Sequence, residues 1–599
     1  MEMKVPNATA DVSASDASAA TRAPGRFRAL VRREEIALVV LAALVGALGG
    51  LLVMGIGGAA QALHVFLFRL EPGAKLSGSQ TLASPLLAFL PVAGGALLGL
   101  MLAWSAWRKS RPLIDPIEAN ALHGGRMSFR DGIVVVAQNL VSNGFGASVG
   151  LEAAYTQISA GLASRFGVAF EMRRGDMRTL VGCGAAAAIA AAFDAPLTGA
   201  FYAFELIIGT YSVVALAPVV AAALCGMFVS RLLSHGSHFI DMTAPATLPA
   251  SAWPAALLLA ALAAGLGILI MQGVTLVERG FRRTGLPAAM RPAVGGLLLG
   301  GLALLTPQVL SSGHGALEVR IDAAMSLSSL FVILALKALA SAVSIGSGFR
   351  GGLFFASLFL GAMLGRIFAT LAGPLLPGVE PVVFAVVGMS ALATAIVGGP
   401  LTMTFLALEM TGDFPIAALV LLAAVATSLA VRRTFGYSFA TWRFHLRGES
   451  IRSAHDIGWI RNLTVGRMMR RDLRTVPTDT SLKAFRRSFP LGSTQRVIAV
   501  DPASDAYAGI VLVPDAYADG LSDLDAPIST LLRFTDATLR PSMNAREAMA
   551  VFDAAESEAL AVVDGPETKR VVGLLTESHT LRRYSEELDL RRREATGTA

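Results

Sequence analysis

Long apolar segments fill the first three quarters of the chain. The first spans residues 36–54, and others follow at roughly 83–105, 130–150, 179–209, 213–232, 252–276, 293–310, 325–346, 351–372, 381–411 and 414–431. Several are interrupted by Gly or Pro, although a plain spanning helix needs about 20 unbroken apolar residues. The pattern predicts a membrane domain in which some helices stop inside the bilayer and line a cavity with their ends.

From about residue 447 the sequence becomes charged and alternating, and it contains a small repeat. Residues 475–489, 496–501 and 509–515 correspond to residues 538–552, 559–564 and 573–579. Each copy reads as a turn with Pro, an amphipathic helix, an apolar strand that ends in Asp and a strand that begins with Gly. We expect two α/β units of about 55–60 residues each that pack as one soluble module.

Composition agrees with this division. Of 599 residues, 54% are hydrophobic and 16% are charged, which is more apolar surface than a soluble core buries. The predicted fold is an all-α polytopic membrane domain followed by a small α/β domain. The expected boundaries are a disordered tail at 1–30, a membrane domain at 31–447, a linker at 448–462, the two units at 463–517 and 526–588, and a tail at 589–599.

The formal charge of +7 comes mostly from arginines beside apolar segments, which favours positive cytoplasmic loops over nucleic-acid binding. An arginine cluster before the first segment predicts cytoplasmic N- and C-termini, and the Ala/Gly/Arg-rich usage suggests a bacterial inner membrane. Cys183 and Cys225 lie in apolar runs, so we expect two unpaired small side chains and no metal site.

Two segments of the membrane part are near copies of each other. APLTGAFYAFEL at 195–206 and GPLTMTFLALEM at 399–410 align at an offset of 204 positions (400 − 196 = 204), which places Glu205 in register with Glu409. Duplicated halves with interrupted helices are typical of secondary transporters and related channels. Residue identities alone do not decide whether the halves are parallel or inverted.

Several motifs together resemble the CLC family of chloride channels and chloride/proton antiporters. They are GASVGLEAAYTQISAG (146–161), FDAPLTGAFYAFE (193–205), PQVLSSGHGALE (307–318), GSGFRGGLFFASLFLGAMLG (346–365), GGPLTMTFLALEMT (398–411) and GYSFATW (436–442). The resemblance implies a homodimer whose subunits are inverted repeats with one anion pathway each. The duplicated segments would then be equivalent helices of the two halves.

The resemblance also implies the site residues. Glu152, which follows Gly150, matches the gating glutamate, whose carboxylate occupies an anion site when it is ionised and swings away when it is protonated. An intramembrane carboxylate is a functional candidate in its own right, and the alternative is a group that faces an aqueous vestibule or caps a helix. Tyr437 matches the pore tyrosine, and Leu353 and Phe354 would offer backbone N–H groups to the same anion. Helix N-termini near Gly150, Gly352 and Pro116 are expected to face this anion as well.

One anion-binding motif of the family is altered here. Alignment on Pro116 places Leu113 where the family has an anion-binding serine, so a hydroxyl donor is lost. Asp115 precedes Pro116 and is expected to cap a helix that begins there. Chloride is the favoured anion, with nitrate, fluoride and other small anions left open.

Proton coupling depends on a second glutamate in the family's antiporters, which aligns here with Leu206. An apolar residue at that position favours a passive channel, gated by voltage or pH, over an antiporter. Glu205 is the remaining candidate for a proton pathway besides Glu152. Because Glu205 and Glu409 recur at equivalent points of the two halves, however, a shared role at helix ends is favoured over proton transfer.

The soluble repeat resembles a pair of CBS domains, a cytoplasmic regulatory module that binds adenine nucleotides in many relatives. Asp515 and Thr576 match two parts of its nucleotide motif, but Leu512 and His579 replace the complementary parts. A role in dimer packing or conformational coupling is therefore favoured over nucleotide binding.

Two other classes of protein are disfavoured. A membrane-embedded enzyme needs a Ser/His, paired-Asp or His/Glu metal constellation on adjacent spans, and no such set is visible. A CBS-regulated cation transporter needs several acids or carbonyl-rich loops in its core, whereas these spans carry almost isolated glutamates. Chloride and the lipid bilayer are the expected partners.

Overall fold

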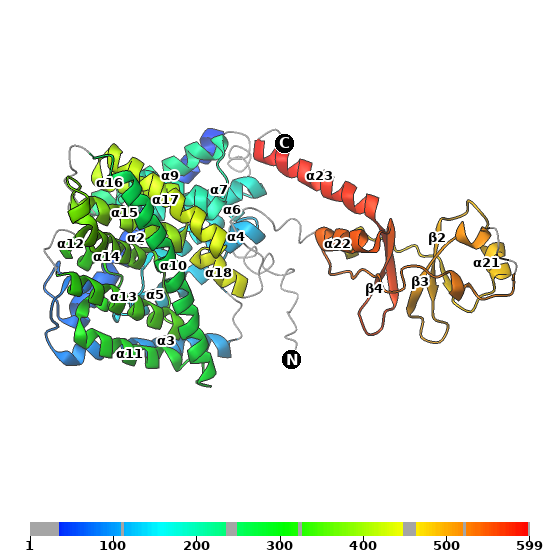
Figure 1. The fold of residues 1–599 in the computed structure, drawn as a ribbon, viewed down its shortest axis with the longest axis horizontal. Coiled ribbons are helices and arrows are strands. Elements are labelled where there is room, and N and C mark those ends of the chain that lie inside the picture. The colour runs from blue at the N-terminus through cyan, green and yellow to red at the C-terminus, as the bar shows by residue number, and fades with distance from the viewer. Residues whose placement is uncertain are drawn as a thin grey trace. The chain divides into compact units, whose positions relative to one another are not determined.

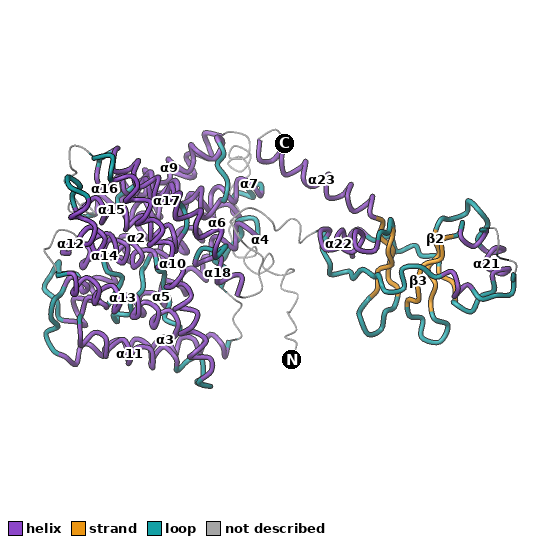
Figure 2. Tube along the Cα trace, in the orientation of Figure 1, coloured by secondary structure: helices purple, strands orange, loops and turns teal. Residues whose placement is uncertain are grey.

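The computed structural model describes residues 35–108, 113–234, 248–320, 326–446, 463–518, 521 and 523–596. The chain divides into two compact units, Met1–Asp456 and Ile457–Ala599, the first helical and the second mixed (Figures 1 and 2). The tail expected at 1–30 and the linker expected at 448–462 lie outside the described residues.

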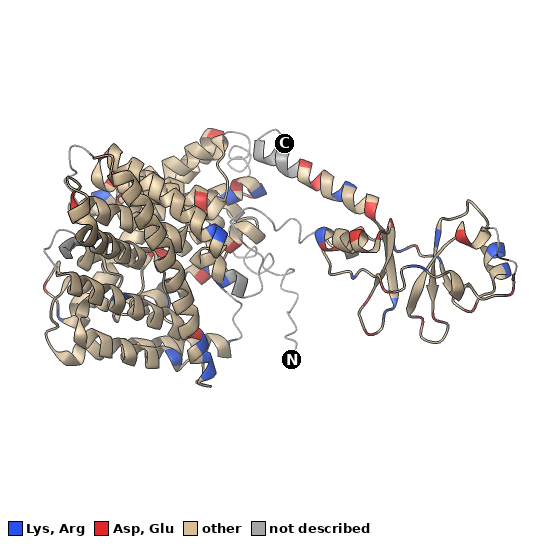
Figure 3. Ribbon diagram, viewed as in Figure 1, with Lys and Arg blue, Asp and Glu red and all other residues tan. Residues whose placement is uncertain are grey.

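Helices build the first unit. Their bounds are α2 Glu35–Phe68, α3 Leu90–Trp107, α4 Pro116–Leu122, α5 Phe129–Gly144, α6 Glu152–Ala169, α7 Arg174–Phe193, α8 Pro196–Tyr202, α9 Val213–Leu233, α10 Ala252–Arg283, α11 Arg291–Leu305, α12 His314–Arg320, α13 Leu327–Ser347, α14 Phe354–Ala372, α15 Pro381–Val397, α16 Pro400–Thr411, α17 Phe414–Thr434 and α18 Phe439–Leu446. Within the described residues, 8 helices are long and apolar enough to cross a membrane. Figure 3 shows few charges on this unit's helices, while α23 of the second unit alternates acidic and basic residues.

The short helices begin and end where the sequence interrupts its apolar segments. Prolines open α4, α8 and α16, because a first-turn residue needs no N–H donor and proline already has a helical φ. One turn of π-helix, Ala203–Ile208, continues α8 and ends at Gly209 with φ 78°. These breaks leave helix ends inside the membrane unit, as the sequence predicts.

The duplicated segments form a reciprocal pair. Glu205, at the C-terminal end of one copy, accepts hydrogen bonds from the backbone N–H groups of Leu401 and Thr402, which open the other copy, at 3.1 and 2.8 Å. Glu409 accepts equivalent bonds from the first turn of α8. The two copies therefore run antiparallel, and the equivalent rings of Phe201 and Phe405 stack 4.2 Å apart between them.

Small residues let the most buried helices approach closely. A Cβ at Gly361 of α14 would lie 2.4 Å from the carbonyl oxygen of Gly388 on α15, and a Cβ at Gly388 would lie 2.5 Å from the carbonyl oxygen of Gly361. Such backbone contact is how membrane helices pack without a large apolar driving force. It fixes α14, whose N-terminus borders the site described below.

The second unit contains the two predicted α/β repeats. The first holds α21 Leu482–Ser488 and the sheet β1 Thr475–Pro477, β2 Arg496–Val500 and β3 Tyr507–Leu512, with β1 parallel and β3 antiparallel to β2. The second holds α22 Ala545–Ala555, the antiparallel pair β4 Ala559–Val563 and β5 Val571–Thr576, and α23 Glu577–Thr596. The helix α23 continues through Thr596 and so extends into the tail expected at 589–599.

Candidate anion site

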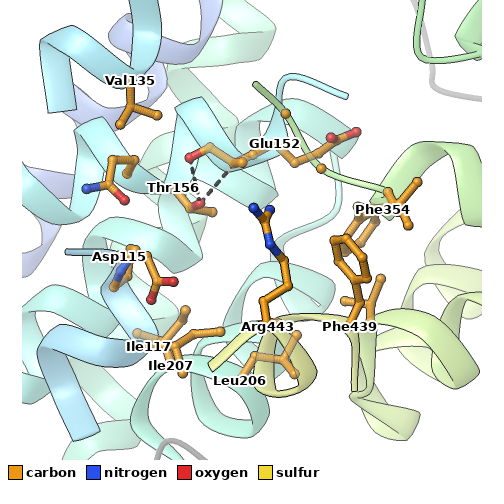
Figure 4. Close-up of a pocket in the computed structure, with 18 of the residues that line it drawn as sticks. Asp115, Ile117, Val135, Glu152, Thr156, Leu206, Ile207, Phe354, Phe439 and Arg443 are labelled. Atoms are coloured by element: carbon orange, nitrogen blue, oxygen red, sulfur yellow. Dashed lines mark hydrogen bonds between the residues drawn. The ribbon is translucent and has the colours of Figure 1, made fainter. Parts of the chain in front are cut away.

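A cavity of about 240 Å³ lies where α4, α6, α14 and α18 converge (Figure 4). Most of its wall is apolar side chain or glycine. The charged or polar side chains that line it are Asp115, Glu152, Thr156, Gln157, Tyr202, Arg350 and Arg443. An ion in this space would meet few polar groups, so each of them matters for what the cavity can hold.

A short antiparallel bridge joins the two loops that lead into α6 and α14. The Gly150 N–H donates to the Gly352 carbonyl at 3.0 Å, and the Gly352 N–H donates back to Gly150 at 3.4 Å. A Cβ on Gly150 would lie 1.9 Å from Oε2 of Glu152, so glycine is required while that carboxylate keeps its place. The bridge brings the N-termini of both helices to the same cavity.

Glu152 is the first residue of α6, and only 5% of its surface is exposed. Neither carboxylate oxygen has a hydrogen-bond partner with normal geometry among the described residues, although the Phe355 amide at the start of α14 faces it. In Figure 4 its side chain runs beside the loop that precedes α14. The carboxylate thus sits among helix N-termini, which favour negative charge, without being locked by a direct bond.

The structure places some of the other predicted ligands in the wall of the cavity and gives others a different role. Leu353, Phe354 and Leu113 all line the cavity, and Leu113 adds an apolar side chain without a hydroxyl donor to its wall. Asp115 caps α4 as predicted, because its Oδ1 accepts the Glu118 N–H at 2.9 Å. Three helix N-termini, at Pro116, Glu152 and Phe354, therefore border one space, as the sequence led us to expect.

Tyr437 is not among the residues that line the cavity. It lies in the turn before α18 and packs against Trp442, with ring centroids 5.5 Å apart. The wall from this part of the chain is formed instead by Phe439, Ala440 and Arg443. Tyr202, which the sequence did not single out, supplies a phenol to the lining from the end of α8.

Arg443 and Arg350 are the two cationic residues of the lining, and sequence reasoning missed both. Figure 4 shows the Arg443 guanidinium reaching from α18 across the cavity toward the first turn of α6. Arg350 precedes α14, and its backbone N–H is held by Ser142 Oγ at 3.0 Å. The available signal was an arginine inside one membrane-domain motif (Arg350) and an arginine directly after another (Arg443), since such charges face cavities or partners.

Glu205 and Leu206 are adjacent in the π-turn but have different surroundings. Leu206 lines the cavity, whereas Glu205 does not. One Glu205 oxygen also accepts the Thr402 hydroxyl at 2.7 Å, which gives this carboxylate three hydrogen bonds to the start of α16. The expectation of a helix-end role for Glu205 and Glu409 agrees with these contacts.

A model of the voltage gated chloride channel family matches residues 94–433. The chain belongs to this family, the CLC proteins. The voltage-gated ClC-type chloride channel ClcB of Citrobacter koseri is 29% identical over 400 residues, which cover 66% of this chain and 95% of that protein. A slow cyanobacterial Cl−/H+ antiporter shares the fold at 22% identity and a TM-score of 0.59, over 68% of this chain and 97% of that one. A eukaryotic CLC transporter shares it at 18% identity and a TM-score of 0.59, over 92% and 98%.

These comparisons confirm the predicted polytopic helical fold with a small C-terminal α/β region, and anion transport is the activity of this CLC chain. Relatives and neighbours include both a named channel and a named antiporter. The family alone therefore does not choose between passive and proton-coupled transport.

The nucleotide candidates of the CLC chain's second unit are engaged locally. Asp515 forms an ion pair with Arg533, with Oδ2 and Nε 2.8 Å apart, and Thr576 Oγ1 accepts the His579 N–H at 3.4 Å. The Asp515 carboxylate is thus paired within the protein.

Proposed function

We propose that this CLC protein is a passive chloride channel in which Glu152 is the gate. The observation that carries the proposal is a buried carboxylate at the N-terminus of α6 that has no direct partner of normal geometry among the described residues. Burying a carboxylate without partners is costly. A group that must leave its position during function gains from being held by helix N-termini, where the Phe355 amide faces it, rather than by an ion pair.

Anion selectivity follows from the donors around the cavity. The N-termini of α6 and α14 each offer unpaired N–H groups and about half a positive charge, and two arginines add full charges. Asp115 is committed to capping α4. This balance disfavours a cation transporter, and chloride is the favoured anion, with nitrate and fluoride as candidates to rank in the same assay.

Gating follows from competition for these donors. An ionised Glu152 takes the place of an anion at the helix N-termini, whereas a protonated Glu152 is neutral and has no such advantage. We expect acid to raise anion flux through the protein, in addition to any dependence on voltage.

Passive transport is favoured over antiport by the other end of the cavity. Leu206 lines it without an ionisable group, and Glu205, which precedes Leu206 in the sequence, has its carboxylate committed to three hydrogen bonds. The alternative is a chloride/proton antiporter in which another group carries the proton. The fold shared with the cyanobacterial antiporter supports this alternative.

The remaining assignments belong to the same proposal. The second unit acts as a CBS pair in packing or conformational coupling, with an adenine nucleotide as a weaker candidate ligand because Asp515 is paired with Arg533. The protein works as a homodimer in a bacterial inner membrane with both termini cytoplasmic, and it conducts ions rather than catalysing a reaction.

The test is chloride efflux from liposomes that contain the purified protein, measured between pH 4.5 and 7.5. Wild-type efflux should rise as the pH falls, and Glu152→Gln should be fast at every pH. Glu380→Gln, on an exposed residue before α15, is the matched control. A Glu152→Gln variant that keeps the wild-type pH dependence would contradict the assignment of the gate.

A further inference from the structure

The lining of the cavity is short of groups that can bind an anion at its α4 and α18 side. Leu113 and Leu206 are apolar, Phe439 and Ala440 contribute apolar side chains, and Tyr437 is absent from the lining. The Gln157 amide is already used, since its Nε2 donates to the Ile114 carbonyl at 2.7 Å. An anion that leaves the helix N-termini therefore crosses a mostly apolar stretch.

Arg443 is the cationic side chain that reaches into this stretch. It is half-buried, its Cζ lies 5.8 Å from the centroid of the Phe439 ring, and its guanidinium points toward the first turn of α6 (Figure 4). A guanidinium offers five N–H donors in a planar fork and keeps its charge at any physiological pH. It can therefore hold one anion while it keeps another interaction.

We propose that the Arg443 guanidinium is an anion-binding group of the cavity and supplies the donors that Leu113 and Tyr437 do not. The inference rests on the proposed anion permeation and adds a specificity-determining residue to it. Asp115 lines the same space, so its carboxylate competes with a bound anion for the guanidinium. That competition keeps binding weak enough for the ion to leave, as conduction requires.

The position of Arg443 makes it distinct from the gate. Glu152 is on α6, whereas Arg443 belongs to α18, the last described helix of the membrane unit. Loss of the arginine should therefore weaken anion binding without removing the pH dependence that Glu152 imposes. An arginine with a purely structural role would not change chloride affinity.

The experiment is calorimetric titration of chloride into the purified full-length protein, with parallel efflux from liposomes. Arg443→Gln should weaken chloride binding about tenfold or more, because charge-assisted bonds to the anion are lost. Arg443→Lys should retain most of the affinity. Arg432→Gln, at the exposed C-terminal turn of α17 and away from the cavity, should bind like the wild type.

A chemical rescue separates charge from folding. Arg443→Cys is made with Cys225→Ser, because Cys225 is partly exposed and Cys183 is buried. Attachment of a positively charged thiosulfonate reagent should restore chloride affinity, and a negatively charged reagent should not. Equal affinity for Arg443→Gln and the wild type, or equal rescue by both reagents, would overturn the inference, whereas a wild-type protein that neither binds nor conducts any anion would overturn the proposed function itself.

Discussion

Glu205 and Glu409 each hold the start of the opposite short helix through the same set of hydrogen bonds. Each carboxylate accepts two backbone N–H groups and one threonine hydroxyl from the first turn of the opposite short helix. For Glu409 the distances are 2.8 Å to Leu197 N, 2.8 Å to Thr198 N and 2.6 Å to Thr198 Oγ1. A glutamine keeps the size of the side chain but offers only one oxygen and places an NH₂ group opposite an N–H donor.

The magnitude follows from these bonds. A hydrogen bond to a charged group contributes about 1.5–3 kcal/mol, and neutral bonds are roughly half as strong. Losing one bond and weakening the other two should therefore reduce the free energy of unfolding by about 3–6 kcal/mol. Leu197 is 40% exposed, whereas Leu401 is partly buried, so water replaces the lost acceptor more easily beside Glu409. We expect Glu205→Gln to be at least as destabilising as Glu409→Gln.

The assay is thermal unfolding of the purified protein in detergent, followed in parallel with chloride and proton flux. Both variants should melt several degrees below the wild type. The control Glu380→Gln, on the exposed surface, should have the melting temperature of the wild type. The two glutamates should behave alike, because they occupy equivalent positions of the two halves. A Glu205→Gln variant of unchanged melting temperature that loses proton movement would refute the helix-end role and assign Glu205 to a proton pathway.

Three further changes have defined outcomes. Gly150→Ala places a Cβ 1.9 Å from Oε2 of Glu152, so the carboxylate is displaced and efflux at pH 7 should approach that of Glu152→Gln; efflux that keeps wild-type pH dependence would contradict the packing. The buried Nζ of Lys337 donates to the carbonyls of Val309 at 3.1 Å and Ser311 at 2.7 Å. Lys337→Met removes this donor and should lower the free energy of unfolding by about 3 kcal/mol or more. An unchanged melting temperature would show that the ammonium does not hold this segment. In the second unit, bonds from the Thr568 hydroxyl and the Arg570 N–H lower the pKa of Asp564 below its usual value. A lowered folded-state pKa gives stability above the unfolded pKa of about 3.9 that is lost as the pH falls through the folded pKa, so Asp564→Asn should increase hydrogen exchange of β4 and β5 at pH 7, and an unchanged exchange rate would contradict this.

Much of the architecture could be predicted from the sequence, because the relevant signals are local or repeated. The 204-residue offset between the duplicated segments predicts that Glu205 and Glu409 play equivalent roles, and the structure gives them equivalent hydrogen bonds. Asp115 before Pro116 is a local cap signal, and it caps α4. The alternation of apolar strands in the soluble part likewise predicts both α/β repeats.

The lining of the cavity was less accessible to sequence reasoning, because it depends on helix rotation and on contacts between distant segments. Tyr437 follows Gly436, which has φ 87°, and that turn directs the chain so that Phe439 and Arg443 of α18 meet the cavity. The bonds of Lys337 to carbonyls 26 to 28 residues earlier have no local sequence signal.

We propose that anions cross this protein without moving protons, under control of Glu152. The most direct test records external chloride and external pH together while a chloride gradient is imposed across liposomes that contain the full-length protein. We expect chloride release with no net proton movement in the wild type, and faster, pH-independent release in Glu152→Gln. Uphill proton movement driven by chloride at a fixed ratio, abolished by Glu152→Gln, would contradict the account and identify an antiporter.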